Sequence, residues 1–160
     1  MDMPAVGDAA PGIALPDETG TIHDLSAQRG RWTIVYFYPA DDTPGCTVEA
    51  CEFRDSNTTI HERGADVWGI SPQGVQSHED FSCKHGGFPF PLLADTSKNV
   101  GKDYGIVGPM GFYRRSVFVV DAEGVIRYAH RALSGLTYRP TTELVDAVKA
   151  AQSVGDPPAV

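Results

Sequence analysis

The chain has 160 residues, of which 41% are hydrophobic and 21% charged, and its formal net charge at pH 7 is −8. A chain of this length fits one domain and can bury a sizeable core. Its acidic balance disfavours nucleic acid and anionic membranes as partners, because phosphate binding needs clustered lysines and arginines. The longest unbroken apolar run, residues 34–38, is far too short to cross a bilayer.

The N-terminus and the cysteines indicate a reducing compartment. Residues 1–4 show no basic segment followed by an apolar stretch, so we expect no secretory signal and a cytoplasmic location. The three cysteines stand at positions 46, 51 and 83. An odd, small number of cysteines argues against a structural disulfide framework. In a reducing compartment, two cysteines five residues apart are more typical of a reactive or metal-binding pair.

The first part of the chain predicts strands and one long helix. Residues 1–30 are rich in Gly, Pro and Asp and predict short strands and turns. Residues 32–38 are aromatic and β-branched and end at Pro39, which predicts a buried central strand. A loop follows, and then a helix that runs to about His61 and is closed by Gly64.

The remaining predicted elements are shorter. Ser77 and Asp80 form a capping box, which predicts a helix start at this point. The elements follow in this order: a buried strand over 66–71, a helix from Ser77 to near Gly86, an extended segment over 89–93, a helix over 96–104, a loop over 106–114, a hairpin of 116–121 with 125–130, and a helix over 141–152.

The order of the predicted elements indicates the fold class. Strand, helix, strand and helix, followed by a hairpin and a last helix, imply βαβ units and a mixed sheet with helices on both faces. We therefore expect a thioredoxin-like α/β fold, in which a mixed central β-sheet is flanked by helices and preceded by an N-terminal β-hairpin. One domain is expected over residues 1–152, with a flexible tail over 153–160.

Cys46 stands where a cysteine becomes reactive. It follows the predicted central strand and loop and falls in the first turn of the next helix. The free N–H groups of a helix start carry a partial positive charge, which favours thiolate over thiol. A thiolate is a nucleophile, and its first oxidation product is a sulfenic acid.

Pro39, Thr43 and Cys46 form the pattern Pro-x-x-x-Thr-x-x-Cys, which suits peroxide cleavage. The Thr43 hydroxyl can accept a hydrogen bond from a hydroperoxide O–H and, with backbone amides, orient the oxygens for in-line attack. Pro39 can screen the thiolate from bulk water and fix the loop. An arginine from elsewhere in the chain would stabilise the thiolate and the charge that develops on the leaving oxygen.

The stretch from Tyr36 to Cys51 resembles the peroxiredoxins, in particular the bacterioferritin comigratory protein or PrxQ group, with its Thr-Pro-Gly-Cys-Thr motif and a second cysteine five residues on. The resemblance extends over nearly the whole chain, through residues 6–11, 91–95 and 115–121. It implies an enzyme, a thioredoxin-dependent peroxidase that reduces hydrogen peroxide and small organic hydroperoxides. It also implies no cofactor and, for this group, a monomer rather than a dimer.

The resemblance also assigns roles to single residues. It implies Cys46 as the peroxidatic cysteine, Cys51 as the resolving cysteine, Thr43 and Pro39 as their surroundings, Arg115 as the activating arginine and Glu49 as the residue that orients it. Arg114 competes for the arginine role. Neighbouring side chains of a strand point to opposite faces, so only one of the two arginines can face Cys46. Register with the apolar run up to Asp121 favours Arg115.

The spacing of the two cysteines has a mechanical consequence. If Cys46 and Cys51 lie on one regular helix, their Cα atoms are about 8 to 9 Å apart. A disulfide needs a Cα separation below about 7 Å. We therefore expect roughly residues 45–55 to unwind during the catalytic cycle. The β-branched Thr47 and Val48 and the poor helix formers at 55–59 are compatible with unwinding.

Other interpretations remain for the cysteines. Cys83 is most simply a helix residue with an inert thiol, and the five histidines show no ligand spacing, so no metal is expected. A redox-sensing or interaction protein, switched by the same Cys46–Cys51 disulfide without high turnover, is the alternative from another functional class. A thiol–disulfide oxidoreductase of the thioredoxin type is disfavoured, because the chain has no Cys-x-x-Cys.

Overall fold

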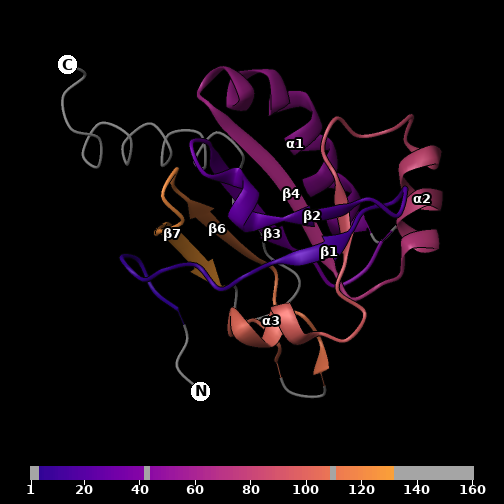
Figure 1. The fold of residues 1–160 in the computed structure, drawn as a ribbon. Coiled ribbons are helices and arrows are strands. Elements are labelled where there is room, and N and C mark those ends of the chain that lie inside the picture. Colours follow the sequence, from indigo (N-terminus) through magenta and orange to yellow (C-terminus); the bar gives the residue numbers. More distant parts are fainter. Residues whose placement is uncertain (1–3, 42–43, 109–110, 132–160) are drawn as a thin grey trace.

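The computed structural model describes residues 4–41, 44–108 and 111–131, without the side chains of residues 44–46 and 49 (Figure 1). Its strands are β1 (Ala14–Pro16), β2 (Ile22–Asp24), β3 (Trp32–Phe37), β4 (Ala65–Ser71), β5 (Leu92–Ala94), β6 (Ser116–Val120) and β7 (Ile126–Arg131). Its helices are α1 (Pro44–Glu62), α2 (Val75–Lys84) and α3 (Asn99–Asp103), with a short 3-10 helix η1 (Leu25–Gln28).

A mixed five-stranded sheet forms the centre of the molecule, in the order β5-β4-β3-β6-β7. β3 pairs in parallel with β4 and antiparallel with β6, and all six of its residues are buried. Its alternate residues enter two different cores: Ile34 and Tyr36 pack with Phe53 of α1, whereas Val35 and Phe37 pack on the opposite face. The expected central strand is confirmed.

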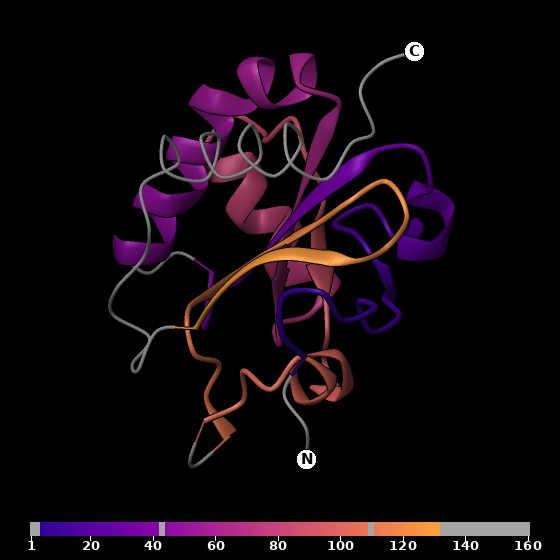
Figure 2. The ribbon, with the colours of Figure 1, turned by 90° about the vertical axis from the view of Figure 1, so that its left-hand side faces the viewer.

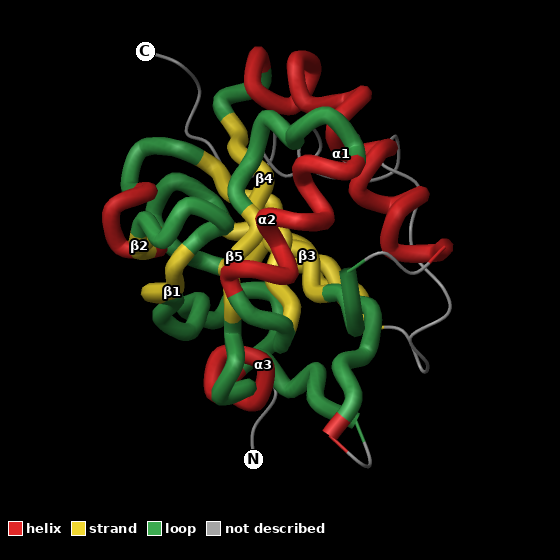
Figure 3. Tube along the Cα trace, turned by 90° about the vertical axis from the view of Figure 1, so that its right-hand side faces the viewer, coloured by secondary structure: helices red, strands yellow, loops and turns green. Residues whose placement is uncertain are grey.

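Helices and the N-terminal hairpin cover the two faces of the sheet. Phe53 of α1 and Phe81 of α2 belong to one buried cluster, and Leu25 of η1 and Val100 of α3 belong to the other. Figure 3 shows α1 and α3 on opposite sides of the strands, and Figure 2 looks onto the β7 edge of the sheet. β1 and β2 pair antiparallel on their own. The fold is therefore the mixed sheet with an N-terminal hairpin that the element order predicts.

The end of α1 follows its sequence signal, whereas the start of α2 does not, and α3 begins three residues later than predicted. α1 ends at Glu62, and Gly64 follows with a φ of +77°, as its glycine signal predicts. The predicted capping box at Ser77 and Asp80 is wrong. α2 begins two residues earlier, at Val75 after an N-cap at Gly74, and the Ser77 hydroxyl donates to a residue outside the helix instead.

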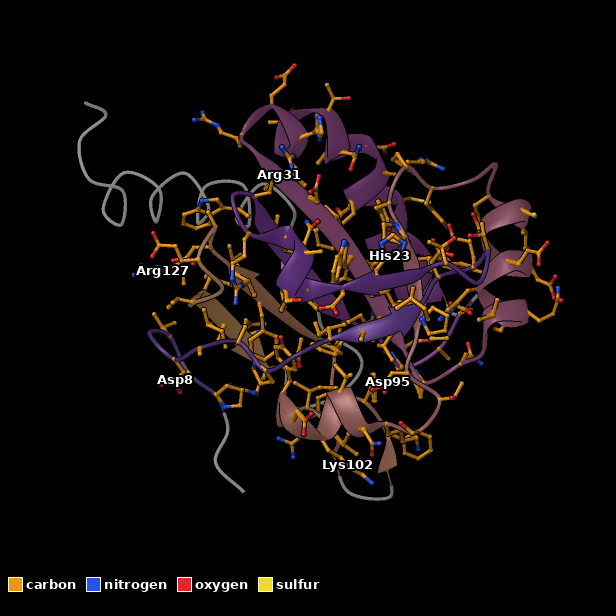
Figure 4. All side chains as sticks on the ribbon, in the orientation of Figure 1. Asp8, His23, Arg31, Asp95, Lys102 and Arg127 are labelled. Carbon is orange, nitrogen blue, oxygen red and sulfur yellow. The ribbon has the colours of Figure 1, made fainter. Side chains whose placement is uncertain are left out.

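The end of the sheet where β3 and β4 begin is closed by an ion pair. Arg31, just before β3, donates from Nε to Asp66 Oδ2 at 2.7 Å, and Figure 4 places Arg31 at the upper end of the molecule. Burial raises the pKa of Asp66, but the hydrogen bonds from Arg31 and Gln28 outweigh it and hold this pKa below its ordinary value. Asp95, just after β5, marks the opposite, carboxyl end of the parallel strands.

Two predictions concern the C-terminal part of the chain, which the structure does not describe. The predicted helix over 141–152 and the tail over 153–160 lie outside the described residues. Within the described ranges, no helix combines the length and the apolar composition that a membrane span requires.

Gly69 of β4 lets an aromatic ring pack against the sheet. It lies opposite Tyr36 of β3, and a Cβ at this position would stand 2.7 Å from the Tyr36 hydroxyl oxygen. The ring of Tyr36 is 4.5 Å from that of Phe53, centroid to centroid, and fixes α1 to the sheet. A glycine inside a strand marks such a close approach.

We predict that Gly69→Ala lowers the free energy of unfolding by about 1 to 3 kcal/mol, because the new methyl group overpacks the space that Tyr36 fills. Urea titration measures the effect. Gly12→Ala is the matched control, since a Cβ there meets no atom within 4 Å, and its change should stay within about 0.5 kcal/mol. Equal stability of Gly69→Ala and the wild type would contradict the packing account.

Candidate active site

Cys46 lies at the start of a long helix that follows the central strand. β3 ends at Phe37, and α1 begins at Pro44, so Cys46 is the third residue of a helix of 19 residues. The first N–H groups of α1 have no partner inside the helix, and the helix dipole adds positive potential there. The backbone thus gives Cys46 the environment in which a thiolate is stabilised.

The structure describes only some of the residues expected around Cys46. Pro39 follows β3 and is half-buried. Thr43 and the side chains of Cys46 and Glu49 lie outside the described residues, so their expected roles stay predictions. Cys51 lies five residues further along α1 and carries a half-buried, free thiol.

The two cysteines are placed on one continuous helix. With a rise of 1.5 Å and a rotation of 100° per residue, the Cα atoms of residues 46 and 51 of a regular helix are about 8 to 9 Å apart. This separation exceeds the limit of about 7 Å for a disulfide. Cys46 and Cys51 therefore cannot bond while α1 keeps its first two turns.

Arg115 lies at the same end of the sheet as the loop that leads to Cys46. β6 runs antiparallel to β3 with Ser116 opposite Phe37, so the residue before Ser116 stands near the residues that follow Phe37. Arg115 is buried, with 3% of its surface exposed. A buried guanidinium at this end of the sheet stabilises anionic groups near it.

Arg114 has different surroundings. Its N–H donates to the Ile106 carbonyl at 2.7 Å, and its Nε lies 3.3 Å from the place where a Cβ on Gly108 would stand. The side chain thus packs along the loop of residues 106–108. The alternation along β6 also separates the two arginines. Val117 belongs to the buried cluster that contains Phe53 of α1, and Phe118 belongs to the cluster on the opposite face. Continued back along the strand, this alternation puts Arg115 on the α1 face and Arg114 on the other.

Asp95 and Tyr113 fix the segment that carries Arg115. The Tyr113 hydroxyl donates to Asp95 Oδ2, and the N–H of Gly101 donates to the same oxygen at 2.9 Å. Burial first, and then the hydrogen bond to Asp95, raise the pKa of Tyr113 far above its ordinary value, so the phenol stays protonated and remains a donor. Two residues before Arg115, the chain is therefore tied to the carboxyl end of β5.

Asp41 is tied in the same way, five residues before Cys46. Its Oδ1 accepts from the Tyr38 hydroxyl at 2.7 Å, and its Oδ2 accepts from Ser77 Oγ at 2.7 Å and lies 2.6 Å from His78 Nδ1. Its backbone N–H donates to Gln73 Oε1. Burial, and then the negative charge of Asp41, raise the pKa of Tyr38 well above its ordinary value, which keeps its hydroxyl a donor.

The cluster around Asp41 is absent from the sequence-based prediction. A weak signal for it exists, because His78, Phe81 and Ser82 are all buried and stand at the i, i+3 and i+4 positions of one helical face. That spacing predicts a buried histidine, and a buried histidine needs polar partners. The partner itself is 37 residues away in the sequence and has no local signature.

The other candidate groups of the sequence analysis are placed as follows. Cys83 lies on α2 with an exposed free thiol. In the part of the chain that the structure describes, no three His, Cys, Asp or Glu side chains come together in a way that suits a metal ion.

A cysteine in the first turn of the helix after a central strand, with a buried arginine at the same end of a mixed sheet, suits a thiol-based oxidoreductase. Residues 6–129 match the AhpC/TSA family. The chloroplast peroxiredoxin Q of Oryza sativa subsp. japonica is 38% identical over 150 residues, which cover 92% of this chain and 67% of that protein.

Solved structures agree with the sequence match. Peroxidoxin BcpB from Mycobacterium tuberculosis has a TM-score of 0.81 and 31% identity, over 93% of this chain and 98% of that one. Peroxiredoxin Q from Xanthomonas campestris has a TM-score of 0.79 and 30% identity, over 94% and 96%. The chain belongs to the AhpC/TSA family, within its PrxQ and bcp group of peroxiredoxins.

Membership of this group confirms three expectations. The fold is the thioredoxin-like fold of peroxiredoxins, the protein is a thiol-dependent peroxidase, and its reaction is the reduction of peroxides. A peroxiredoxin of this group uses a thioredoxin-type reductant to return to the thiol state. The roles of single residues in this chain are a separate question.

Proposed function

We propose that the protein reduces hydrogen peroxide and small organic hydroperoxides through Cys46, closes a disulfide from Cys46 to Cys51, and is reduced again by thioredoxin. The observation that carries this proposal is the position of Cys46 in the first turn of α1, directly after the central strand and at the end of the sheet where Arg115 is buried. It is the cysteine whose backbone favours a thiolate.

The proposed first step is attack of the Cys46 thiolate on one oxygen of the hydroperoxide. The S–O bond forms as the O–O bond breaks, and the leaving oxygen takes a proton and departs as water or an alcohol, which leaves a sulfenic acid on Cys46. The Thr43 hydroxyl accepts from the hydroperoxide O–H, and Pro39 keeps bulk water from the thiolate. Two electrons pass from sulfur to the peroxide.

Arg115 supplies the positive charge for this step. It stabilises the thiolate before attack and the negative charge on the leaving oxygen during it, and both effects are strong in a buried site. Glu49, three residues after Cys46 on α1, holds the guanidinium in place. Arg114 takes no part, because its side chain lies along the loop of residues 106–108.

The second step joins the cysteines. The Cys51 thiolate attacks the sulfur of the Cys46 sulfenic acid, the S–S bond forms, and hydroxide leaves and is protonated to water. Because the two residues share α1, roughly residues 45–55 must unwind first. A thiolate of thioredoxin, or of a similar dithiol, then attacks the disulfide. The two thiols of the reductant end as a disulfide, and Cys46 and Cys51 return to thiols.

We place the protein in the cytoplasm as a monomer, with no cofactor or metal. The free thiols of Cys51 and Cys83 suit a reducing compartment. Among the described residues, the exposed large apolar side chains are Val6, Ile22, Val48 and Phe112, which come from four different segments of the sequence. One domain over 1–152 with a tail over 153–160 is proposed; the family match lies within it.

We predict that wild type consumes hydrogen peroxide rapidly and repeatedly with thioredoxin, thioredoxin reductase and NADPH, because it can cycle through the disulfide. Cys46→Ser should be inactive, since it lacks the nucleophile. Cys51→Ser should reduce one equivalent and then stall, since its sulfenic acid has no intramolecular partner. Stopped-flow kinetics measures the three proteins.

Cys83→Ser is the matched control and should keep full turnover, because the proposed cycle does not use the α2 thiol. Turnover by Cys46→Ser would sink the assignment of the nucleophile. Uniformly slow oxidation of every variant would favour the sensor interpretation over the peroxidase.

For the two arginines, we predict that Arg115→Gln lowers the second-order rate of Cys46 oxidation by about a hundredfold, the usual effect of losing one donor to a developing oxyanion. Arg114→Gln, which removes an equal charge one residue away, should leave this rate nearly unchanged. Single-turnover stopped flow with hydrogen peroxide gives both rates. A larger loss in Arg114→Gln than in Arg115→Gln would reverse the assignment.

A further inference from the structure

Asp41, in the loop between β3 and α1, is held by the side chains of four other residues. Its side chain is 4% exposed and that of its partner His78 is 0% exposed. Both carboxylate oxygens and the backbone N–H are engaged: by Tyr38 just after β3, by Gln73 just before α2, and by Ser77 and His78 in the first turns of α2. The carboxylate thus joins two elements that are distant in the sequence.

The protons of the pair can be counted from its geometry. His78 Nε2 lies 2.9 Å from the Leu93 carbonyl oxygen, which can only accept, so Nε2 carries a hydrogen. Nδ1 lies 2.6 Å from Asp41 Oδ2, and a second hydrogen must lie between these atoms. Each ring nitrogen of His78 therefore makes a hydrogen bond, one to Asp41 and one to the Leu93 carbonyl.

The unit formed by His78 and Asp41 can stay buried because its ring nitrogens and carboxylate oxygens are all hydrogen-bonded. An isolated buried carboxylate or imidazolium is costly, whereas a paired and fully hydrogen-bonded one is tolerated. Through Nε2 the unit is also bonded to the Leu93 carbonyl in β5. His78 thus connects three parts of the framework: the segment after β3, the helix α2 and the edge strand β5.

We propose that His78 is a positioning residue for the loop of residues 38–43, which joins β3 to α1 and leads to Cys46. Through Asp41, His78 fixes this loop two residues before Thr43 and five before Cys46. This inference rests on the proposed function, because it concerns the loop of the proposed nucleophile. The anchor lies before α1 and shares no residue with it. The helix can therefore unwind to bring Cys46 to Cys51 while Asp41 stays in place, and reduction returns the loop to its reactive geometry.

Two substitutions separate the bond to Asp41 from the bond to Leu93. In His78→Asn the side-chain amide nitrogen takes the place of Nδ1 and can still donate to Asp41. In His78→Gln it takes the place of Nε2 and can donate only to Leu93. A role in mere packing would give the opposite order, because Gln is closer than Asn to the volume of the buried histidine.

The experiment measures the second-order rate of the first oxidation of Cys46 by hydrogen peroxide, in single turnover. We expect His78→Gln and Asp41→Asn each to slow it by about tenfold to a hundredfold, as a displaced nucleophile does, and His78→Asn to keep most of the rate. The double variant His78→Gln/Asp41→Asn should be no slower than either single one, since both act through one contact. Gln76→Ala, on the exposed face of α2, is the control and should react like wild type.

Folding of each variant is checked by circular dichroism and thermal unfolding. Should His78→Gln or Asp41→Asn not fold, Ser77→Ala removes one hydrogen bond to Asp41 without burying a charge, and it should slow the same step several-fold. In the wild type, long-range proton–nitrogen NMR of the His78 ring should show a hydrogen on Nε2 and one shared at Nδ1. A ring without a hydrogen on Nε2 overturns the anchor.

The outcomes keep the inference and the proposed function apart. A wild type that does not oxidise at Cys46 contradicts the proposed function, and the NMR arm still decides whether the anchor exists. A wild type that reacts rapidly, together with a His78→Gln variant that reacts as fast, overturns the positioning role and leaves the peroxidase intact. Equal losses in His78→Asn and His78→Gln overturn it as well, because the donor to Asp41 would then not matter.

Discussion

The position of two cysteines on one helix is the constraint on which the rest of this molecule depends. Cys46 needs the start of α1, because the helix gives its thiolate a positive environment. The same helix keeps Cys51 about 8 to 9 Å away, beyond the reach of a disulfide. In the proposed cycle, attack on the peroxide requires a folded start of α1, and resolution of the sulfenic acid requires that this start unfolds.

Two buried hydrogen-bonded clusters, at Asp41 and at Tyr113 with Asp95, hold the segments near Cys46 in place. Asp41, in the loop before α1, is fixed to α2 through His78 and Ser77, and Tyr113 is fixed to Asp95 close in sequence to Arg115. Both anchors stand at the carboxyl end of the parallel strands, and both lie outside the segment that must unwind. The framework therefore keeps the surroundings of Cys46 in place while α1 changes, which limits the ordering cost of each return to the reactive state.

The elements that the sequence predicts well are those with local causes. β3 and β4 are almost fully buried and rich in aromatic and β-branched residues, and Gly64 follows the end of α1 because glycine adopts a positive φ without strain. Cys46 could likewise be found from a short motif, whereas the role of Arg115 came from family resemblance. The start of α2 and the anchor at Asp41 could not be predicted, because Ser77 and His78 bond to a residue 36 and 37 positions away.

Amide hydrogen exchange, followed by mass spectrometry on the reduced protein and on its Cys46–Cys51 disulfide form, tests the central claim most directly. The account predicts that residues 45–55 lose their protection in the disulfide form, because α1 cannot keep its first turns and the bond at once. The amides of β3 should exchange equally slowly in both forms. Equal protection across residues 45–55 in the two forms would contradict the requirement for unwinding.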